Sequence, residues 1–244
     1  MVWAWRTLND GRVEVDRNDG NGYQALGLNL VSGVVEAAKR TMQWEQLARE
    51  KAAKYGIPVS WLLAFTFAES GGDDKAENYC CAGLMAIYWK VHGKSRQDML
   101  DAEKNMDYGA SLLQMSAEKG YELPGVASIH VAGGGTKNEP HKSPSSPYGM
   151  AEHSWGPNAQ GDGSQGYIDR VVRANNMFVD ILEGRLDIGA PPVAPGPAPP
   201  PPPVEPGRGT DAGSPRRQQA AFGVGLALGL GAMVFGPRIK ERWG

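Results

Sequence analysis

Apolar residues recur with helical spacing over most of the chain between residues 34 and 184. The first predicted helix covers about 34–54, and its apolar stripe consists of Val34, Ala38, Met42, Ala48 and Ala52. Gly56 is suited to the position after that helix, and Pro58 to the first turn of the next one. Residues 58–70 are almost entirely apolar, so we expect a buried helix there.

Three further helices follow from the same reasoning. Ser95 and Asp98 match the pattern of a capping box, which predicts a helix over about 95–119. A short helix is expected near 126–132. The last helix ends near residue 184, and its apolar positions are Ile168, Val171, Val172, Phe178, Ile181 and Leu182.

Two segments outside these helices have patterns of their own. Residues 1–30 are interpreted as an N-terminal attachment, in which residues 7–16 alternate around Asn9-Asp10-Gly11 and predict a β-hairpin. Residues 133–166 form a long connection rich in Gly, Pro and Ser. Its aromatic and histidine residues suit the wall of a binding groove, and a surface loop is the alternative.

Composition narrows the class of protein. The chain has 244 residues, 41% of them hydrophobic, with seven Trp and a net charge of -2. A core is therefore expected, and charge gives no reason to expect a nucleic acid as partner. Cys80 and Cys81 are adjacent, and we expect two small buried thiols rather than a structural disulfide. His92, His141 and His153 show no metal-ligand spacing, so no metal site is expected.

The composition changes abruptly near the C-terminus. Residues 188–219 are interpreted as a linker, since ten of the sixteen residues from 191 to 206 are proline. Residues 220–237 are apolar and predict a transmembrane helix, followed by a basic tail over 238–244. A helix buried against partner proteins in an assembly is the alternative. The N-terminus lacks the basic and apolar regions of a cleavable secretory signal.

Glu69 is the main candidate for chemistry. It is a lone acid at the end of the apolar run over 58–70. A carboxyl group placed there is poorly solvated and lies at the negative end of a helix, so we expect its pKa to be raised. A carboxylic acid that stays protonated near neutral pH can donate a proton to a glycosidic oxygen. Asp73 and Asp74 follow in a polar loop, where acids are usually solvated.

An ordered set of short motifs begins at Glu69. The set consists of Glu69-Ser70, Ala82-Gly83-Leu84-Met85, Asn105-x-x-x-Gly109-x-x-x-Leu113, Ala132-Gly133 and Tyr167-Ile168-x-x-Val171. In this order, over about residues 45–183, the chain resembles the soluble lytic transglycosylase family, which is related to goose-type lysozyme.

The resemblance implies a mainly α-helical, lysozyme-like domain over residues 31–187. It implies cleavage of the MurNAc-β-1,4-GlcNAc bond of peptidoglycan without water, which gives a 1,6-anhydro product. Glu69 would be the catalytic residue, acting first as acid and then as base. The substrate-binding residues implied are Ser70, Asn78, Gly83, Leu84, Met85, His130 and Tyr167. The resemblance implies no metal and no cofactor.

Four positions depart from the family's pattern. Ala86 stands where the family usually has Gln, and Asn78 stands where it usually has Ser. His130-Val131 replaces a Tyr-Asn pair, and His130 is either a hydrogen-bond donor near Glu69 or a histidine of the core. These departures leave open hydrolysis by water, as in lysozyme.

The resemblance, the missing signal and the apolar segment together suggest a biological setting. We expect a virion-associated enzyme that acts in the bacterial cell envelope and opens the cell wall during phage genome entry. Its expected partners are peptidoglycan strands, the membrane and other virion or envelope proteins. Two alternatives stay open: a structural or glycan-binding part of an envelope-spanning conduit, and an accessory transglycosylase of secretion or conjugation.

Overall fold

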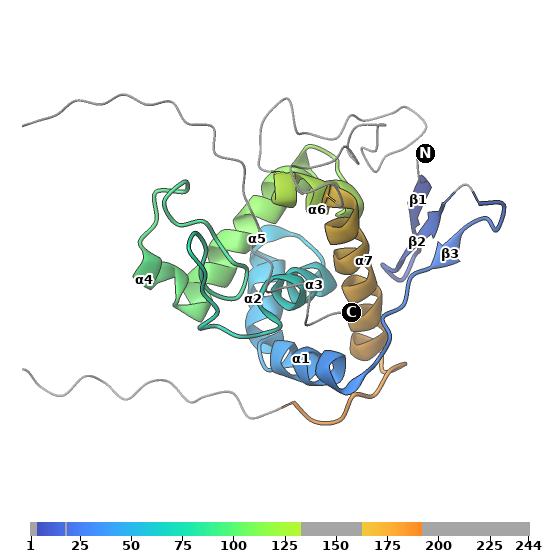
Figure 1. Ribbon diagram of the computed structural model, residues 1–244, viewed down its shortest axis with the longest axis horizontal. Coiled ribbons are helices and arrows are strands. Elements are labelled where there is room, and N and C mark those ends of the chain that lie inside the picture. The colour runs from blue at the N-terminus through green and yellow to red at the C-terminus, as the bar shows by residue number, and fades with distance from the viewer. Residues whose placement is uncertain (1–3, 18, 133–162, 192–244) are drawn as a thin grey trace, which may run out of the picture. The chain divides into compact units, whose positions relative to one another are not determined.

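The computed structural model describes residues 4–17, 19–132 and 163–191 (Figure 1). This part of the chain is mainly helical, with seven helices and one antiparallel sheet of three strands, which confirms the predicted mainly-α class. The connection over 133–162 lies outside the described residues, as do the apolar segment and all but the first residues of the predicted linker. The elements in chain order are β1 (Ala4–Thr7), β2 (Val13–Asp16), β3 (Gln24–Ala25), α1 (Ser32–Met42), α2 (Glu45–Tyr55), α3 (Val59–Ser70), α4 (Arg96–Met99), α5 (Ala102–Glu118), α6 (Leu123–Ala132) and α7 (Gly163–Leu182).

Helix α3 lies at the centre of the fold (Figure 1). Ten of its twelve residues are buried, which confirms the buried helix predicted over 58–70. Helices α1, α2 and α7 pack against it, while α5 contacts both α2 and α6, and α6 contacts α7. A helix that is apolar on every side is stable only when neighbours cover every side. A polar side chain at the end of α3 can therefore lie at the edge of the core.

The prediction of a single helix over 34–54 is wrong, because a break at Gln43 and Trp44 separates α1 from α2. Both side chains donate hydrogen bonds to the carbonyl oxygen of Gly72, from Gln43 Nε2 at 3.3 Å and from Trp44 Nε1 at 2.9 Å. A Cβ on Gly72 would lie 2.4 Å from the backbone nitrogen of Thr41, so only glycine allows this approach. The break thus results from packing against the segment after α3.

The helix predicted over 95–119 is also divided in two. The capping role of Ser95 is confirmed, since its Oγ accepts a hydrogen bond from the backbone nitrogen of Asp98 at 2.9 Å. Helix α4 nevertheless has only four residues. Asp101 then caps α5, with its Oδ1 accepting from the backbone nitrogen of Lys104 at 3.0 Å. A second capping aspartate inside the predicted helix explains the interruption.

The predicted hairpin around Asn9-Asp10-Gly11 is confirmed. Strands β1 and β2 pair in antiparallel register with Thr7 opposite Val13, and β3 pairs with the other edge of β2. The buried apolar side chains of this N-terminal region belong to the same core cluster as those of α3 and α7; they are Trp5, Val13, Val15 and Leu26. The sheet is therefore packed into the helical core.

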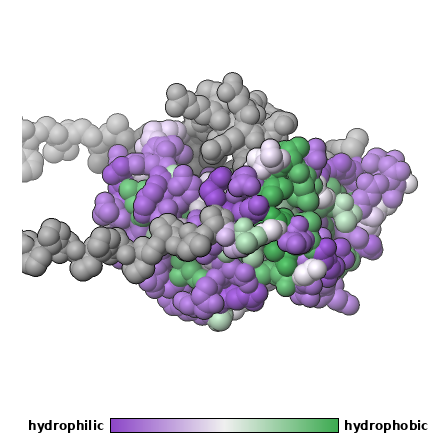
Figure 2. All heavy atoms as spheres, turned by 90° about the horizontal axis from the view of Figure 1, so that it is seen from below, coloured by the Kyte–Doolittle hydropathy of each residue, from purple (hydrophilic) through white to green (hydrophobic). Residues whose placement is uncertain are grey.

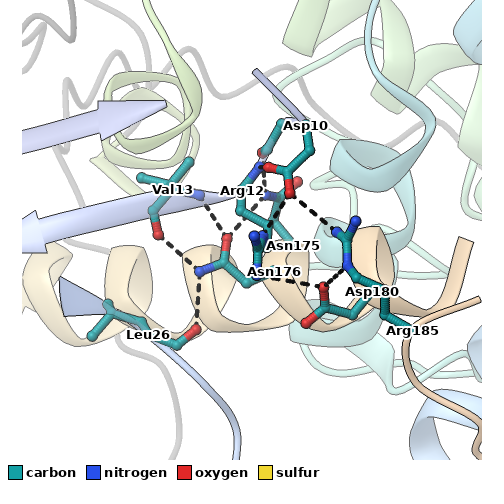
Figure 3. A network of polar contacts seen from close by, with 9 residues as sticks. Asp10, Arg12, Val13, Leu26, Asn175, Asn176, Asp180 and Arg185 are labelled. Carbon is teal, nitrogen blue, oxygen red and sulfur yellow. Dashed lines mark hydrogen bonds and ion pairs between the residues drawn. The ribbon is translucent and has the colours of Figure 1, made fainter. Parts of the chain in front are cut away.

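Asn176 joins α7 to this N-terminal region (Figure 3). Its Oδ1 accepts a hydrogen bond from the backbone nitrogen of Val13 at 2.7 Å. Its Nδ2 donates to the carbonyl oxygens of Val13 at 2.8 Å and Leu26 at 2.9 Å. The side chain is only 3% exposed. All three bonds are shielded from water, so the amide of Asn176 determines how the strands lie on α7.

A group of charged residues continues the same junction toward the end of α7 (Figure 3). The guanidinium of Arg185 donates to Asp180 at 2.7 Å and to Asp10 at 3.2 Å, and Arg12 donates to Asp10 at 2.8 Å. Burial works against ionisation of Asp10, but hydrogen bonds from Arg12 and the nearby positive charges hold its pKa below the usual value. The turn of the hairpin is thus linked electrostatically to the helix.

One face of the described part of the chain is largely polar. Figure 2 shows polar residues over most of the face seen from below, with a band of apolar residues crossing it. Within 4–17, 19–132 and 163–191, none of the helices combines the length and the apolar character that crossing a bilayer requires. The predicted transmembrane segment over 220–237 belongs to the part of the chain outside the described residues.

Candidate active site

Glu69 lies in the last turn of α3, two residues before the left-handed Gly71 that ends the helix. Its side chain is only 10% exposed, so the carboxyl group is largely removed from water. Because α3 is apolar on all sides, Glu69 stands at the border between the core and the surface. A carboxyl group in this position interacts mainly with protein groups rather than with solvent.

Two side chains from distant parts of the sequence contact the same oxygen of Glu69. Tyr167, near the beginning of α7, donates a hydrogen bond from its hydroxyl group to Glu69 Oε1. His130, near the end of α6, places its Nε2 3.2 Å from Glu69 Oε1. The structure thus brings together three of the residues proposed from the sequence, one from each of three helices.

Phe65 completes this arrangement, and sequence reasoning missed it. Its ring packs edge-on against the imidazole of His130, with 5.0 Å between the ring centres, and lies 6.4 Å from the ring of Tyr167. The rings of His130 and Tyr167 are nearly parallel, with 6.1 Å between their centres. Phe65 lies one helical turn before Glu69, and this spacing is the signal that could have identified it.

Tyr167 is held in its neutral form. Its side chain is buried, and burial together with the negative charge of Glu69 raises the pKa of the phenol well above its ordinary value of 10.0. The positive charge of Arg170 acts in the opposite direction and is the smallest of the contributions. Over the physiological pH range Tyr167 is therefore a hydrogen-bond donor to the carboxyl group of Glu69 and not a base.

The turn over Gly83, Leu84 and Met85 is fixed by the core. Gly83 has a φ of +78°, and a Cβ there would lie 2.0 Å from the carbonyl oxygen of Met99, so the position requires glycine. The side chains of Leu84 and Met85 are completely buried. Gly83 is buried as well, so this turn belongs to the core of the described structure, although the sequence suggested all three residues as substrate-binding.

Two other candidates use their polar groups locally. The Ser70 hydroxyl donates to the carbonyl oxygen of Thr66 at 3.0 Å and accepts from the backbone nitrogen of Gly72 at 3.2 Å, so it closes the end of α3. Asn78 is exposed on the loop after α3. Its side-chain oxygen accepts hydrogen bonds within the loop, which leaves its NH₂ group as the donor available to a ligand.

Cys80 and Cys81 are joined by a disulfide, so the prediction of two free thiols was wrong. Both side chains are 6% exposed, as expected for buried cysteines. The Asn78 side-chain oxygen accepts from the backbone nitrogens of Cys80 at 3.0 Å and Cys81 at 2.9 Å, and the Asn78 nitrogen donates to the carbonyl oxygen of Cys81 at 3.0 Å. These bonds fold the backbone into a tight turn that accommodates the bridge between neighbouring residues.

His92 and Tyr108 form a second polar pair that sequence reasoning did not single out. Nδ1 of His92 lies 3.1 Å from the hydroxyl oxygen of Tyr108, and the ammonium group of Lys94 lies 4.3 Å from the centre of the Tyr108 ring. Burial, followed by the nearby His130 and Lys94, lowers the pKa of His92. His92 is therefore a neutral hydrogen-bonding group close enough to His130 to be influenced by it.

The chemical capacity of the site follows from these contacts. One carboxyl group, with a neutral phenol and an imidazole beside it, can transfer a single proton and be stabilised when it ionises. Among the described residues, no group of three or more His, Cys, Asp or Glu side chains is arranged to hold a metal ion. No protein-family model and no curated protein sequence matches this chain.

Proposed function

We propose that this protein is a peptidoglycan lytic transglycosylase whose helical domain is lysozyme-like and whose catalytic carboxyl group is Glu69. The observation that carries this proposal is the set of contacts at Glu69 Oε1. A largely buried carboxyl group at the end of the central helix is contacted by the Tyr167 hydroxyl and by His130 Nε2 at 3.2 Å. This arrangement suits a group that releases a proton and must then exist as a carboxylate.

The neighbouring acids support a mechanism with one carboxyl group. Asp73 is exposed, and its Oδ1 accepts from the backbone nitrogen of Lys75 at 2.9 Å. Asp74 pairs with the ammonium group of Lys75 at 2.7 Å. Most glycosidases use two carboxyl groups, and substrate-assisted enzymes use a group of the sugar in place of the second. The acetamido group of N-acetylmuramic acid is suited to that role.

In the proposed reaction, Glu69 first donates its proton to the glycosidic oxygen while the bond from this oxygen to C1 breaks. The acetamido oxygen bonds to C1 and stabilises the resulting positive charge. The Glu69 carboxylate then accepts the proton of the C6 hydroxyl, and O6 displaces the acetamido oxygen from C1 to close the 1,6-anhydro ring. The Tyr167 hydroxyl stabilises the carboxylate between the two steps, because a hydrogen bond to a charged acceptor is stronger than one to a neutral acceptor.

The test of this proposal compares peptidoglycan solubilisation by the full chain and by the variant Glu69→Gln. Loss of the acid–base group should reduce the rate about 10²–10⁴-fold. Glu36→Gln is the matched control, because Glu36 is exposed on α1 and pairs with Lys39 at 3.5 Å. Equal rates for the wild type and Glu69→Gln would contradict the proposed enzymatic function and would favour a structural or glycan-binding role for the domain.

Mass spectrometry of the released fragments separates the two possible reactions. Products that end in 1,6-anhydro-muramic acid support transglycosylation, whereas reducing ends show that water enters and that the protein is a muramidase.

We also propose that the enzyme acts in the cell envelope as part of a phage particle, with residues 220–237 attaching it to the membrane. Deleting residues 219–244 should then release a membrane-bound protein into the soluble fraction without loss of peptidoglycan cleavage. Continued membrane binding after the deletion would contradict this attachment.

A further inference from the structure

Arg170 places a positive charge beside the candidate active site. It follows Tyr167 by three residues on α7, and its guanidinium carbon lies 5.3 Å from the centre of the Tyr167 ring. The Tyr167 hydroxyl in turn donates to Oε1 of the Glu69 carboxyl group. A chain of two direct contacts therefore connects the guanidinium with the proposed catalytic group.

One hydrogen-bond donor of this arginine is left unpaired in the described part of the chain. Arg170 Nε is buried and has no hydrogen-bond partner there. The adjacent acid, Asp169, is occupied by other arginines: Arg173 Nε donates to it at 2.7 Å, and the Arg17 guanidinium lies 3.5 Å from it. Buried donors are nearly always paired in folded proteins, because an unpaired one loses its hydration without compensation.

We propose that Arg170 binds a carboxylate of the substrate. Peptidoglycan carries free carboxylates on its peptide stems, and on muramic acid wherever the stem is missing. A chitin strand has the same β-1,4-linked amino-sugar backbone without any acid. A guanidinium group presents several N–H donors in one plane, which matches the two oxygens of a carboxylate. This inference rests on the proposed function, and it assigns to Arg170 the selection of peptidoglycan over neutral glycans.

Binding should be measured separately from cleavage. The full chain with Glu69→Gln leaves the ligand intact, and Arg170→Gln and Arg170→Lys are added to that background. The two probes are a soluble peptidoglycan fragment with intact peptide stems and chitohexaose, both titrated by calorimetry. Arg49→Gln is the control, because it removes one positive charge from an exposed pair on α2, where Arg49 lies 2.7 Å from Glu45.

Arg170→Gln should weaken binding of the peptidoglycan fragment about tenfold or more and leave chitohexaose binding within about twofold, since a hydrogen bond to a charged group is lost only with the acidic ligand. Arg170→Lys should show an intermediate loss that grows with salt concentration, because it keeps the charge without the planar donors. Equal weakening for both probes, or no weakening for either, would overturn the inference.

Circular dichroism and thermal unfolding show whether each variant folds. If Arg170→Gln does not fold, Arg170→Lys decides, and unchanged affinity of that variant for the peptidoglycan fragment contradicts a planar carboxylate contact. The two proposals can fail separately. If binding depends on Arg170 but the wild type cleaves no peptidoglycan, the carboxylate site is supported and the transglycosylase proposal is contradicted. If the wild type cleaves peptidoglycan but binding does not depend on Arg170, the transglycosylase proposal is supported and the carboxylate site is contradicted.

Discussion

The side-chain amide of Asn105 lies so close to Gly83 that a Cβ on this glycine would be 2.4 Å from Asn105 Nδ2. Asn105 is completely buried. Its Nδ2 donates to the carbonyl oxygens of Ala82 at 2.8 Å and Met99 at 2.9 Å, and its Oδ1 accepts from the backbone nitrogen of Met85 at 2.8 Å. One side chain of α5 therefore holds the turn that begins at Gly83.

Asn105→Ala should lower the free energy of unfolding by about 2–4 kcal/mol, because it removes three buried hydrogen bonds. The Met99 carbonyl oxygen and the Met85 backbone nitrogen lose the partner described above, whereas the Ala82 carbonyl oxygen keeps its bond from the Ile87 backbone nitrogen at 3.1 Å. Urea unfolding followed by circular dichroism measures the change. Gln114→Ala on the same helix is the control, since it removes one hydrogen bond to Glu118 on the surface and should change stability by less than about 0.5 kcal/mol. Similar effects for the two variants would contradict the structural role of Asn105.

Gly109 and Met85 form a second close approach between α5 and this turn. A Cβ on Gly109 would lie 2.2 Å from the sulfur atom of Met85, so Gly109→Ala should destabilise the fold by about 1–3 kcal/mol through overpacking. Gly33→Ala is the opposite case, because nothing lies within 4 Å of a Cβ there and alanine favours the helix. Thermal unfolding should therefore show a lower Tm for the first variant and an unchanged or higher Tm for the second.

The sequence predicts those parts of the fold that depend on local patterns. The apolar run over 58–70 predicts the buried helix with Glu69 in its last turn, and Asn9-Asp10-Gly11 predicts the hairpin. The break between α1 and α2 has no local signal, because it depends on hydrogen bonds from Gln43 and Trp44 to Gly72. Contacts between residues distant in sequence decide such features.

The same distinction applies to the candidate site. Glu69 and Tyr167 stand out in the sequence because each belongs to a recognisable motif, whereas Phe65 resembles any other apolar residue of its helix. Leu84 and Met85 belong to a motif as well, but the sequence does not reveal that their side chains point into the core. A motif identifies a segment near a site; only packing shows which atoms of that segment are accessible.

Asn176→Asp should loosen the N-terminal sheet from α7. The carboxylate can still accept from the backbone nitrogen of Val13, but it cannot donate to the carbonyl oxygens of Val13 and Leu26, which the amide reaches at 2.8 and 2.9 Å. A loss of about 2–4 kcal/mol is expected, because two acceptors lose their donor and a charge is buried. Hydrogen exchange should become faster in residues 4–26. Exchange rates equal to those of the wild type would show that the amide does not hold the sheet.

Tyr167→Phe should reduce the rate of peptidoglycan cleavage about 10–100-fold, because the carboxylate formed on Glu69 loses a charge-assisted hydrogen bond. Tyr55→Phe is a matched control, since the Tyr55 hydroxyl of α2 donates to another carboxylate, that of Asp107 in α5, at 3.0 Å. The control should cleave peptidoglycan at the wild-type rate. Equal losses in the two variants would mean that the effect comes from stability, which thermal unfolding of both proteins would reveal.

The free energy of unfolding at alkaline pH should also depend on the ionisation of Tyr167. Burial and the charge of Glu69 raise the pKa of Tyr167 well above 10.0, its ordinary value in the unfolded chain. Below pH 10.0 the phenol is neutral in both states, so its contribution to stability is fully present. As the pH rises further, the unfolded state releases the proton while the folded state retains it, and this contribution is lost.

The free energy of unfolding of the wild type should therefore fall more steeply above pH 10.0 than that of Tyr167→Phe, which has no phenol to ionise at this position. Urea unfolding of both proteins from neutral pH to above pH 10.0 measures the two slopes. The phenol–carboxylate contact requires the curves to converge as the pH rises, because the wild type loses an advantage that the variant never had. Parallel curves would show that Tyr167 ionises as easily in the folded protein as in the unfolded chain, and would exclude a buried hydrogen bond to Glu69.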